Sequence, residues 1–493
     1  MGRDSGTVSH GTMDDPFEID MSVLEPTLYY NRSTPGKDIS SVQPQVLTEL
    51  TNRVAGDVVL PASSSYDELR NVFNGAGSPA AIVRAQTSDD VSAAIRFARE
   101  HHLALSVRSG GHGLSGLATN NGGLVIDLAR FNAVEILDPA RHLVRIGAGA
   151  HWGDVAQALA PHGLAISSGD TRQVGVGGLT LGGGIGWMVR KYGLTIDSLE
   201  AADLVTADGR ALHVSAREHP NLFWAIRGGG GNFGVVTSFD FYAQPCGEIV
   251  GGVVTYDPAD AENVLSAWAR AMREAPEELS STVVLFSGFG PQMPAQIMAL
   301  LCYAGDDEAR ANEAIKPFLR LGAVRSQDIQ RKPYHAMLED AASPPPALRL
   351  VGHDGFLKTL NAETIAALAA NYGQTGKPIA QIRALGGAVD RVSSDATAFA
   401  HRGNEALVVV PAFAPKDASD EQAQQIRQAA WQPLAPFASG AYLNFVSDVS
   451  EATVAAIYPS ATYARLARIK AEYDPDNIFN QTQNIKPALT AQG

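Results

Sequence analysis

The chain has 493 residues, 45% of them hydrophobic and 18% charged, so it can bury a large core and is not disordered as a whole. Its formal net charge of −14 excludes a nucleic-acid partner, because phosphates would be repelled and no arginine and lysine cluster offsets the repulsion. A chain of this length favours two domains over a single core.

The cysteines and the apolar runs restrict the metal chemistry and the compartment. Cys246 and Cys302 are too few for a disulfide framework or a four-cysteine metal site, although they could pair with each other. We expect two buried free thiols, and we find no metal-binding motif. No apolar run is long enough to span a membrane, and the first residues lack the apolar segment of a signal peptide. We therefore expect a cytoplasmic protein that has no membrane partner.

Residues 1–45 contain few apolar positions and several carboxylates, which indicates an acidic arm, flexible or wrapped over the body. Helical periodicity then predicts a helix at 89–101, with Ser88 or Asp89 as its N-cap. The strand at 235–242 should have one solvent-facing side. The other elements predicted up to residue 245 are strands at 103–107, 124–128 and 143–146, a helix at 152–161, a hairpin of strands 199–206 and 211–215, and a helix at 220–226.

Beyond Pro245 the predicted elements become longer. They are strands at 249–256, 281–287, 296–303, 380–385 and 406–411, and helices at 259–273, 306–320, 363–371 and 419–433. Neighbouring strands such as 281–287 and 296–303 are too close for a crossover helix, so they must be antiparallel. This pattern predicts a second domain with a large antiparallel sheet covered by helices, and an α+β fold overall. A strand at 440–445 and a helix with a polar tail at 459–493 complete the chain.

The first glycine-rich stretch, residues 107–113, contains a histidine and matches a dinucleotide fingerprint by letter only. The motif G-x-G-x-x-G that begins at Gly111 would have to open a helix, and residues 118–123 cannot form one, so a Rossmann dehydrogenase is disfavoured. What remains is a tight loop whose backbone N–H groups can converge on an anion such as a pyrophosphate. A turn histidine that bonds its own backbone is the simpler explanation of His112, and this alternative stays open.

A second glycine-rich stretch covers residues 174–186, and a third covers 227–234. Each ordered glycine costs roughly 0.5–1 kcal/mol relative to alanine, a cost that is tolerated where a ligand must contact backbone. Crowded turns are the alternative explanation and fit less well. Three separate places of backbone approach suit an extended ligand better than a compact one.

These stretches resemble a known family in their order and spacing. The matching segments are VRSGGH at 107–112, VGVGG at 174–178, GGGIG at 182–186, RGGGGNFG at 227–234, YLNF at 442–445, YARL at 463–466 and YDPDNIF at 473–479. They are similar to the FAD-binding domain of berberine-bridge-enzyme-like oxidases, FAD-linked flavoproteins of the vanillyl-alcohol-oxidase, or PCMH, type. The resemblance covers about residues 75–245 and 439–486, whereas residues 248–438 match more loosely.

The resemblance implies a division of the chain into four parts. After the arm at 1–45, a two-part FAD-binding domain of PCMH type would occupy 46–245 and a substrate domain 246–438. Residues 439–493 would return to the FAD-binding domain.

It also implies the cofactor site. His112 would be joined through a ring nitrogen to the 8α-methyl group of FAD, residues 109–113 would cradle the pyrophosphate, and residues 171–178 would pass the isoalloxazine ring. The implied cofactor-binding residues are Arg108, Ser109, Gly110, Gly111, His112, Gly113, Thr171, Val174, Gly175, Gly177, Gly178, Gly182, Val235, Val236 and Asn484.

One position departs from the family pattern. Many relatives hold the flavin by a second bond to a cysteine four residues before the first glycine of V-G-V-G-G, and that position is Thr171 here. Neither cysteine of the chain is near it in sequence. We therefore expect a single covalent link, at His112.

Tyr442 matches the tyrosine that resembles the catalytic base of the family. A free tyrosine titrates near 10, so Tyr442 would need cationic or hydrogen-bonding neighbours to act at neutral pH. A strand tyrosine that packs in the core is an equally good explanation of its residue type. His401, Arg402 and Tyr458 are weaker candidates that we do not assign.

The family implies a covalently flavinylated oxidase that takes a hydride from a CH–OH, CH–NH or C–H group of a small molecule and passes electrons to O2 to give H2O2. Sugars, polyketides and alkaloids are substrates of relatives. An apolar pocket formed by Phe286, Phe289, Tyr303 and Phe356 would select the substrate. The alternatives are a dehydrogenase, oxygenase or cyclase that uses another acceptor, and a non-enzymatic flavin-storage or carbohydrate-binding protein. We expect a monomer or homodimer.

Overall fold

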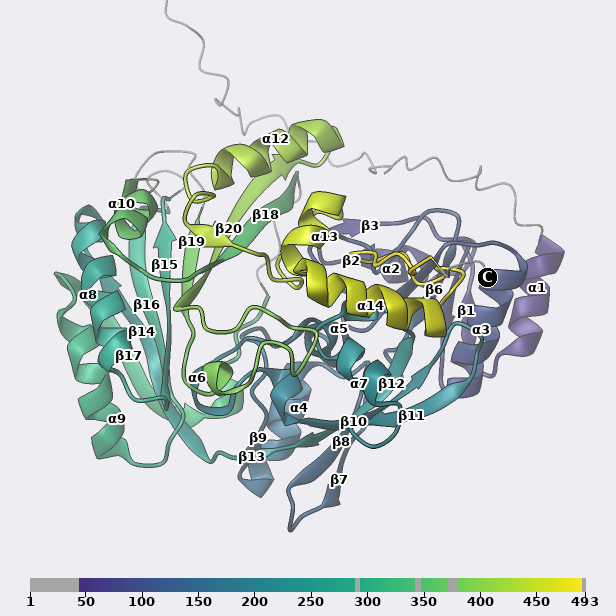
Figure 1. Cartoon of the computed structure of the whole chain (residues 1–493), viewed down its shortest axis with the longest axis horizontal. Coiled ribbons are helices and arrows are strands. Elements are labelled where there is room, and N and C mark those ends of the chain that lie inside the picture. Colours follow the sequence, from purple (N-terminus) through teal and green to yellow (C-terminus); the bar gives the residue numbers. More distant parts are fainter. Residues whose placement is uncertain (1–43, 289–292, 342–346, 371, 373–378, 490–493) are drawn as a thin grey trace, which may run out of the picture.

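The computed structural model describes residues 44–288, 293–341, 347–370, 372 and 379–489. The acidic arm expected at 1–45 lies almost entirely outside the described residues, and so does Phe289. The described chain has a four-stranded sheet, a five-stranded sheet and two two-stranded pairs in its first half, and a large eight-stranded sheet in its second half (Figure 1). The C-terminal helices, yellow in Figure 1, lie against the N-terminal part rather than beyond the large sheet.

The first sheet is mostly parallel, and its strand order is β1-β4-β6-β5. Its strands are β1 (Asp57–Val59), β4 (Ala81–Arg84), β5 (Leu105–Arg108) and β6 (Leu124–Asp127), and it is accompanied by α1 (Pro44–Arg53) and α3 (Ser88–Glu100). The predicted N-cap of α3 is wrong, because Thr87 caps the helix. Its side chain accepts from the Asp90 amide, and the Asp90 carboxylate accepts from the Thr87 amide in return.

The second sheet is antiparallel, with the order β11-β10-β12-β8-β7. Its strands are β7 (Val134–Asp138), β8 (Leu143–Gly147), β10 (Leu199–Val205), β11 (Ala211–Ser215) and β12 (Val235–Tyr242), and the nearby helices are α4 (Trp152–Leu159), α5 (Val176–Gly182), α6 (Val189–Tyr192) and α7 (Pro220–Ile226). The hairpin across Asp208 and Gly209 is confirmed. The solvent-facing side expected for β12 is wrong: six of its residues are buried, and only Ser238 and Tyr242 are half-buried.

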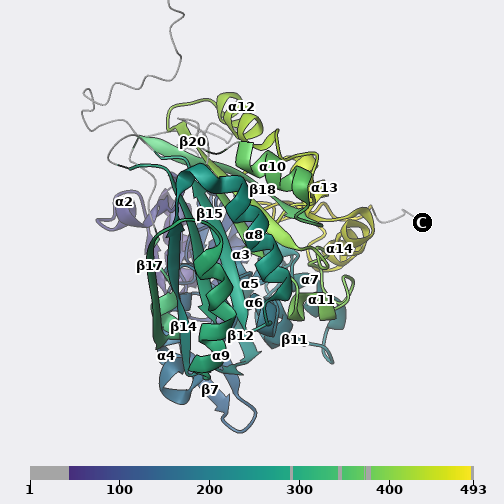
Figure 2. The same cartoon turned by 90° about the vertical axis from the view of Figure 1, so that its left-hand side faces the viewer.

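The large sheet is antiparallel, as predicted, with the order β17-β14-β16-β15-β19-β20-β18-β21. Its strands are β14 (Glu248–Tyr256), β15 (Leu279–Phe286), β16 (Gln296–Tyr303), β17 (Val324–Pro333), β18 (Leu348–Leu357), β19 (Ala380–Ala384), β20 (Ala406–Pro415) and β21 (Ala438–Ser439). The helices α8 (Ala261–Glu274), α9 (Glu308–Ile315), α10 (Ala362–Ala370) and α12 (Asp420–Trp431) accompany it, and Figure 2 shows α8 and α9 in front of its outer face.

The two faces of this sheet have different partners, because side chains alternate along a strand. On β20, Ala406, Val408 and Val410 pack with the covering helices. Leu407 and Val409 point the other way and pack with Tyr442 and its neighbours. The inner face of the large sheet is therefore the one that meets the candidate site.

The expected strand at 440–445 is wrong. Only Ala438–Ser439 (β21) is a strand, and the chain then turns at Tyr442, whose carbonyl accepts from the Phe445 amide at 3.0 Å. Two helices follow, α13 (Glu451–Ile457) and α14 (Ser460–Tyr473). Among the helices that the structure describes, none has both the length and the apolar character that crossing a bilayer requires.

Candidate functional site

The first two glycine stretches contact each other through their backbones. A Cβ added to Gly110 would lie 2.4 Å from the Gly175 amide nitrogen, and one added to Gly175 would lie 2.2 Å from the Gly110 nitrogen. The Ser109 hydroxyl fastens the contact, since it donates to the Ala148 carbonyl at 2.6 Å and accepts from the Gly177 amide at 3.2 Å. Crowding, the alternative left open by the sequence, therefore explains the glycines at 110 and 175.

Other glycines in the three stretches face open space. A Cβ added to Gly178 or Gly231 would have no atom within 4 Å, and one added to Gly113 would meet only the Ser115 hydroxyl, at 3.9 Å. Gly178 lies in α5, so the second stretch is partly helical rather than a series of loops. Where no side chain covers the backbone and the space beside it is open, a bulky cofactor can approach the main chain closely.

His112 lies at the edge of this space, and its ring nitrogens make no hydrogen bond among the described residues. Its ring stacks on Phe73, with centroids 4.9 Å apart. A turn histidine that bonds its own backbone is therefore not what the structure contains. Burial, together with the nearby His151 imidazole, lowers the pKa of His112. This shift favours the neutral ring, which has a nitrogen lone pair that can form a bond.

Arg108 is committed to the scaffold. Its guanidinium pairs with Asp127 at 2.6 Å, across β5 and β6, and both side chains are buried. It also donates to the Leu69 carbonyl. Arg108 thus holds the strand from which the first glycine loop departs, and its charge is already balanced.

Thr171 lies where three segments of the chain meet. It forms a parallel bridge with Glu339, in which the Arg172 amide donates to the Glu339 carbonyl at 2.8 Å and the Glu339 amide donates to the Asp170 carbonyl at 2.9 Å. Arg383, on the inner face of the large sheet, pairs with the Asp170 carboxylate at 2.6 Å. The Arg383 guanidinium also lies 5.0 Å from the Phe445 ring centroid.

The two carboxyl groups beside Thr171 have opposite pKa shifts. Burial disfavours the charge of Asp170, but the charge and hydrogen bond of Arg383 outweigh it and lower the pKa of Asp170. Burial raises the pKa of Glu339, and the negative charge of Asp170 raises it further. Sequence reasoning missed Glu339 because it becomes a neighbour of Thr171 only in the folded chain.

Tyr442 is enclosed, and its hydroxyl oxygen accepts three hydrogen bonds. The donors are the Gly184 amide at 2.9 Å, the Ile185 amide at 3.2 Å and the Asn444 side-chain amide at 2.8 Å. These bonds favour the phenolate, but burial dominates and raises the pKa of Tyr442 to about 12. The side chain is only 2% exposed.

Asp354 lies directly behind this tyrosine and was also missed. One of its carboxylate oxygens accepts from the Tyr442 backbone amide at 2.5 Å, and the other has no hydrogen-bond partner in the described structure. Burial raises the pKa of Asp354 to about 8. It is carried by β18, a strand that the sequence did not predict.

Val235, Val236 and Asn484, which the resemblance also assigns to the cofactor site, lie in two different places. Val235 and Val236 are buried in β12, within the main core. Asn484 has a buried side-chain oxygen without a partner among the described residues. The C-terminal segment that carries it is fixed to the third glycine stretch by Asn232, which accepts from the Ile485 amide at 2.9 Å and donates to the Gln483 carbonyl at 3.2 Å.

Val174 and Gly182 pack against neighbouring segments of the chain. The Val174 carbonyl accepts from the Trp152 amide at 3.0 Å. A Cβ added to Gly182 would lie 2.1 Å from the Asn444 side-chain oxygen. Gly182 thereby lets Asn444 approach α5 closely.

Three residues that we left unassigned have structural surroundings. Arg402 pairs with Asp197 at 2.6 Å, with both side chains buried. The His401 ring stacks on Phe356 with centroids 4.7 Å apart, and Tyr458 is buried in the main core. The two cysteines are free and buried, as expected. Within the described ranges, no three His, Cys, Asp or Glu side chains gather in a way that could hold a metal ion.

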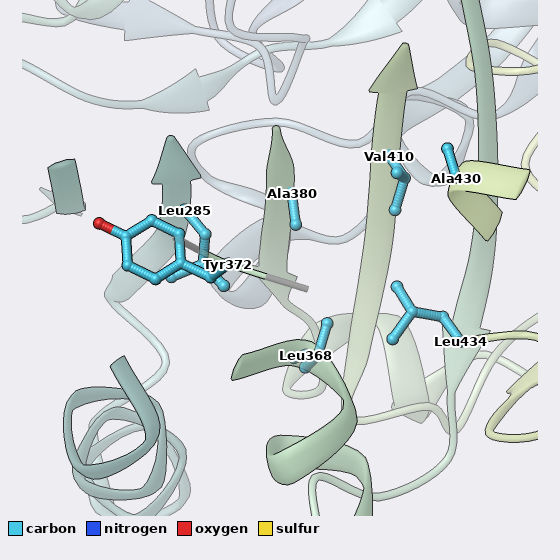
Figure 3. A pocket seen from close by; sticks show the side chains of 7 residues that line it. All are labelled: Leu285, Leu368, Tyr372, Ala380, Val410, Ala430 and Leu434. Carbon is cyan, nitrogen blue, oxygen red and sulfur yellow. The ribbon is translucent and has the colours of Figure 1, made fainter. Parts of the chain in front are cut away.

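The expected apolar substrate pocket is wrong in its membership. Tyr303 packs under the helices on the outer face of the large sheet, whereas Phe356 packs with Tyr442 on the inner face. Figure 3 shows a pocket on the outer, helix-covered side, lined by Leu285, Leu368, Tyr372, Ala380, Val410, Ala430 and Leu434. Its volume of about 10 Å³ admits at most about one water molecule, so it cannot hold a substrate.

Comparisons with known proteins agree with this geometry. Two family models match, the FAD binding domain at residues 79–215 and the berberine and berberine-like domain at residues 441–486. The (R)-6-hydroxynicotine oxidase of Paenarthrobacter nicotinovorans is 32% identical over 88% of this chain and 97% of its own length. The chitooligosaccharide oxidase of Gibberella zeae is 30% identical over 83% of this chain and 87% of its own.

Solved structures are similar as well. The 6-hydroxy-D-nicotine oxidase of Arthrobacter nicotinovorans superimposes with a TM-score of 0.77 at 30% identity, covering 88% of this chain and 98% of that one. A berberine-bridge-enzyme-like protein of Physcomitrella patens gives a TM-score of 0.80 at 22% identity, covering 90% and 99%, and so shows the shared fold.

Proposed function

The chain belongs to the berberine-bridge-enzyme-like family of FAD-linked oxidases, and from this premise we propose that it is a covalently flavinylated oxidase acting on a CH–OH or CH–NH group. That it is an FAD-linked oxidoreductase follows from the family; the covalent bond, the reacting group and the use of O2 are the proposal. Relatives named for a hydroxynicotine and for chitooligosaccharides support both reacting groups.

His112 carries the proposal. Its ring favours the neutral form, is stacked on Phe73 and is free at both nitrogens among the described residues, and it lies where the two glycine stretches meet. When bound, FAD supplies the acceptor of the substrate hydride, and its electrons pass to O2 to give H2O2. We propose that the open backbone at Gly113 and Gly178 and the unpaired amide oxygen of Asn484 face this cofactor.

The same surroundings support a single tether. Thr171 has a hydroxyl in place of a thiol and donates it to Asp170 at 2.9 Å. Cys246 and Cys302 pack together in a different cluster, with Tyr334 and Met337. Burial raises the pKa of the Cys246 thiol to about 11 and that of Cys302 as well, so neither supplies a reactive thiolate.

On the reaction side we propose that Tyr442 acts by orienting its neighbours. Its hydroxyl ties the Gly184 and Ile185 amides to the Asn444 side chain, and Asp354 fixes its backbone from behind. The role of catalytic base, which the family resemblance implies for Tyr442, stays a prediction. A pKa of about 12 and an almost closed environment leave little phenolate at neutral pH.

We propose that residues 46–245 bind the cofactor, that 246–438 cover its reactive face, and that 439–493 return to close the site. The connections of this last segment support that division. Tyr442, before α13, accepts from the Gly184 amide, and Ile485, after α14, donates to Asn232 of the third glycine stretch.

The test is an anaerobic screen of the purified protein against chito- and cello-oligosaccharides, cyclic secondary amines and aromatic polyketides. We expect one class to bleach the flavin absorbance, and air to restore it with one H2O2 formed per substrate oxidised. Bleaching without peroxide would instead identify a dehydrogenase, oxygenase or cyclase with another acceptor. A flavin that no member of the panel reduces would contradict the proposal.

A further inference from the structure

The Glu339 side chain shares a face of the backbone with Thr171. The two residues are partners in a parallel bridge, and bridge partners project their side chains to the same side. Both neighbouring peptide groups are fixed, through the amides of Arg172 and Glu339. If Thr171 borders the flavin ring, as the family resemblance implies for residues 171–178, the Glu339 carboxyl group borders it too.

Unlike its neighbours, the Glu339 carboxylate is not balanced by a partner. Asp170 is held by Arg383 and Thr171, and Asp340 by Gln173 at 2.8 Å. No hydrogen bond or ion pair to the Glu339 carboxylate is found in the part of the chain that the structure describes. Its surroundings are crowded enough for burial to raise its pKa, yet Glu339 remains accessible to solvent, in contrast to the enclosed Tyr442.

We propose that Glu339 is the catalytic base of the oxidation, the group that takes the proton from the substrate O–H or N–H. This inference rests on the proposed function. In the step, the substrate C–H bond breaks with its electron pair, and the hydride leaves for the flavin. The O–H or N–H bond breaks, its electrons form the new C=O or C=N bond, and the proton passes to a Glu339 carboxylate oxygen. Dioxygen later takes the two electrons, and the base returns its proton to water.

The charges that face Glu339 come from three segments and suit this role. Asp170 lies on the segment before Thr171, Arg383 on β19, and Lys332 on β17. Burial and Asp170 raise the pKa of Glu339, whereas Lys332 and Arg383 oppose the rise. A carboxylate whose pKa is raised is a stronger base than the carboxylate of a free glutamate. In enzymes, two neighbouring carboxyl groups whose pKa values are shifted in opposite directions commonly have different roles, as we propose for Glu339 and Asp170.

The placement is tested first without any substrate, with sulfite as the probe. Sulfite adds to oxidised flavin and makes it anionic, so a carboxylate beside the ring opposes the addition. We expect Glu339→Gln to bind sulfite at least about tenfold more tightly, a factor equal to about 1.4 kcal/mol, and Asp340→Asn, its matched control, to bind it as the wild type does. Equal affinity of Glu339→Gln and the wild type would overturn the proposal.

The role is tested by anaerobic flavin reduction over a range of pH, using the panel member that reduces the wild type fastest. We expect Glu339→Gln to lower kcat/KM between about 100-fold and 10,000-fold and to lose the acid limb of the profile. Asp170→Asn removes the facing negative charge, so its acid limb should move to lower pH. An acid limb unchanged in both variants would overturn the assignment. If no panel member reduces the wild type, the proposed function fails, while the sulfite result still decides where Glu339 lies.

Discussion

Gly110 and Gly175 lie backbone against backbone, although they belong to different glycine stretches, one that follows β5 and one that leads into α5. An added Cβ on either would come within 2.4 Å of the other's amide nitrogen. The two stretches therefore form one continuous backbone wall, with His112 at its edge. Glycines such as Gly110 and Gly175 are needed for the close packing of the two segments, whereas others, such as Gly178, face open space.

Substitutions should separate these two kinds of glycine. Gly110→Ala places a methyl group against the Gly175 backbone, so we expect a loss of about 1–3 kcal/mol in the free energy of unfolding, measured by urea denaturation. Gly178→Val places its side chain in open space and removes a glycine from α5, so it should not lower the unfolding free energy of the FAD-free protein. It should, however, yield a protein with little bound flavin. Equal flavin content of Gly178→Val and the wild type would show that the cofactor does not pass Gly178.

His112→Ala should abolish the covalent link. We expect the wild type to give a fluorescent flavin band on a denaturing gel and a tryptic peptide containing His112 that carries the mass of FAD. The variant should give neither. Acid precipitation that releases all flavin from the wild type would contradict the proposal.

Thr171→Cys is the complementary change. If Thr171 borders the flavin ring as proposed, the new thiol should allow a second covalent attachment, seen as a flavin that links the tryptic peptide containing position 171 to the one containing His112. In the His112→Ala background, the same change should restore a fluorescent band. No attachment in either background would place Thr171 away from the ring.

Local patterns in the sequence were sufficient for most elements. The helix α7 and the strand β12 have the predicted bounds, and the hairpin of β10 and β11 follows from its Asp-Gly turn. β17 was missed because its residues, Val324–Pro333, are mostly exposed and polar, so no alternation marks them. β18 was missed because Gly352, Asp354 and Gly355 interrupt its apolar pattern.

The candidate site was predictable only in the part that a motif marks. The segments around His112 and Thr171 contain glycine patterns that can be found in a linear sequence. Glu339 and Asp354 acquire their roles from chain segments far away in sequence, Thr171 for one and Tyr442 for the other. The burial that shifts their pKa values exists only after folding.

A buried ion pair holds the C-terminal segment, residues 439–493, against the third glycine stretch. Lys470 pairs with Asp474 at 2.6 Å, and both side chains are fully buried. Lys470 also donates to the Asn232 and Phe479 carbonyls at 2.8 and 2.9 Å. Lys470→Met should lower the free energy of unfolding by about 3–5 kcal/mol, because it leaves a buried carboxylate without its partner. Lys486→Met, which breaks only the exposed pair with Glu451, should unfold at the wild-type denaturant concentration.

Tyr442→Phe tests the two roles considered for this residue. Removing the hydroxyl leaves the Gly184 and Ile185 amides without their acceptor and leaves the Asn444 side-chain amide only the Leu179 carbonyl, so stability should fall by about 1–3 kcal/mol. Turnover should fall as well, with covalent flavin intact, because Asn444 loses one of its two hydrogen bonds and the Gly184 and Ile185 amides are no longer tied to it. Full turnover would show that Tyr442 has no part in the reaction.

The pH profile then distinguishes an orienting tyrosine from a basic one. Because burial raises the pKa of Tyr442 to about 12, a reaction that needed its phenolate would accelerate about tenfold per pH unit throughout the neutral and alkaline range. A reaction that uses Glu339 should instead rise through an acid limb above the usual glutamate range and then stay level. We expect the level profile in the wild type and, at a lower plateau, in Tyr442→Phe. A wild-type rate that keeps rising through the alkaline range, and a variant that lacks this rise, would assign the proton to Tyr442.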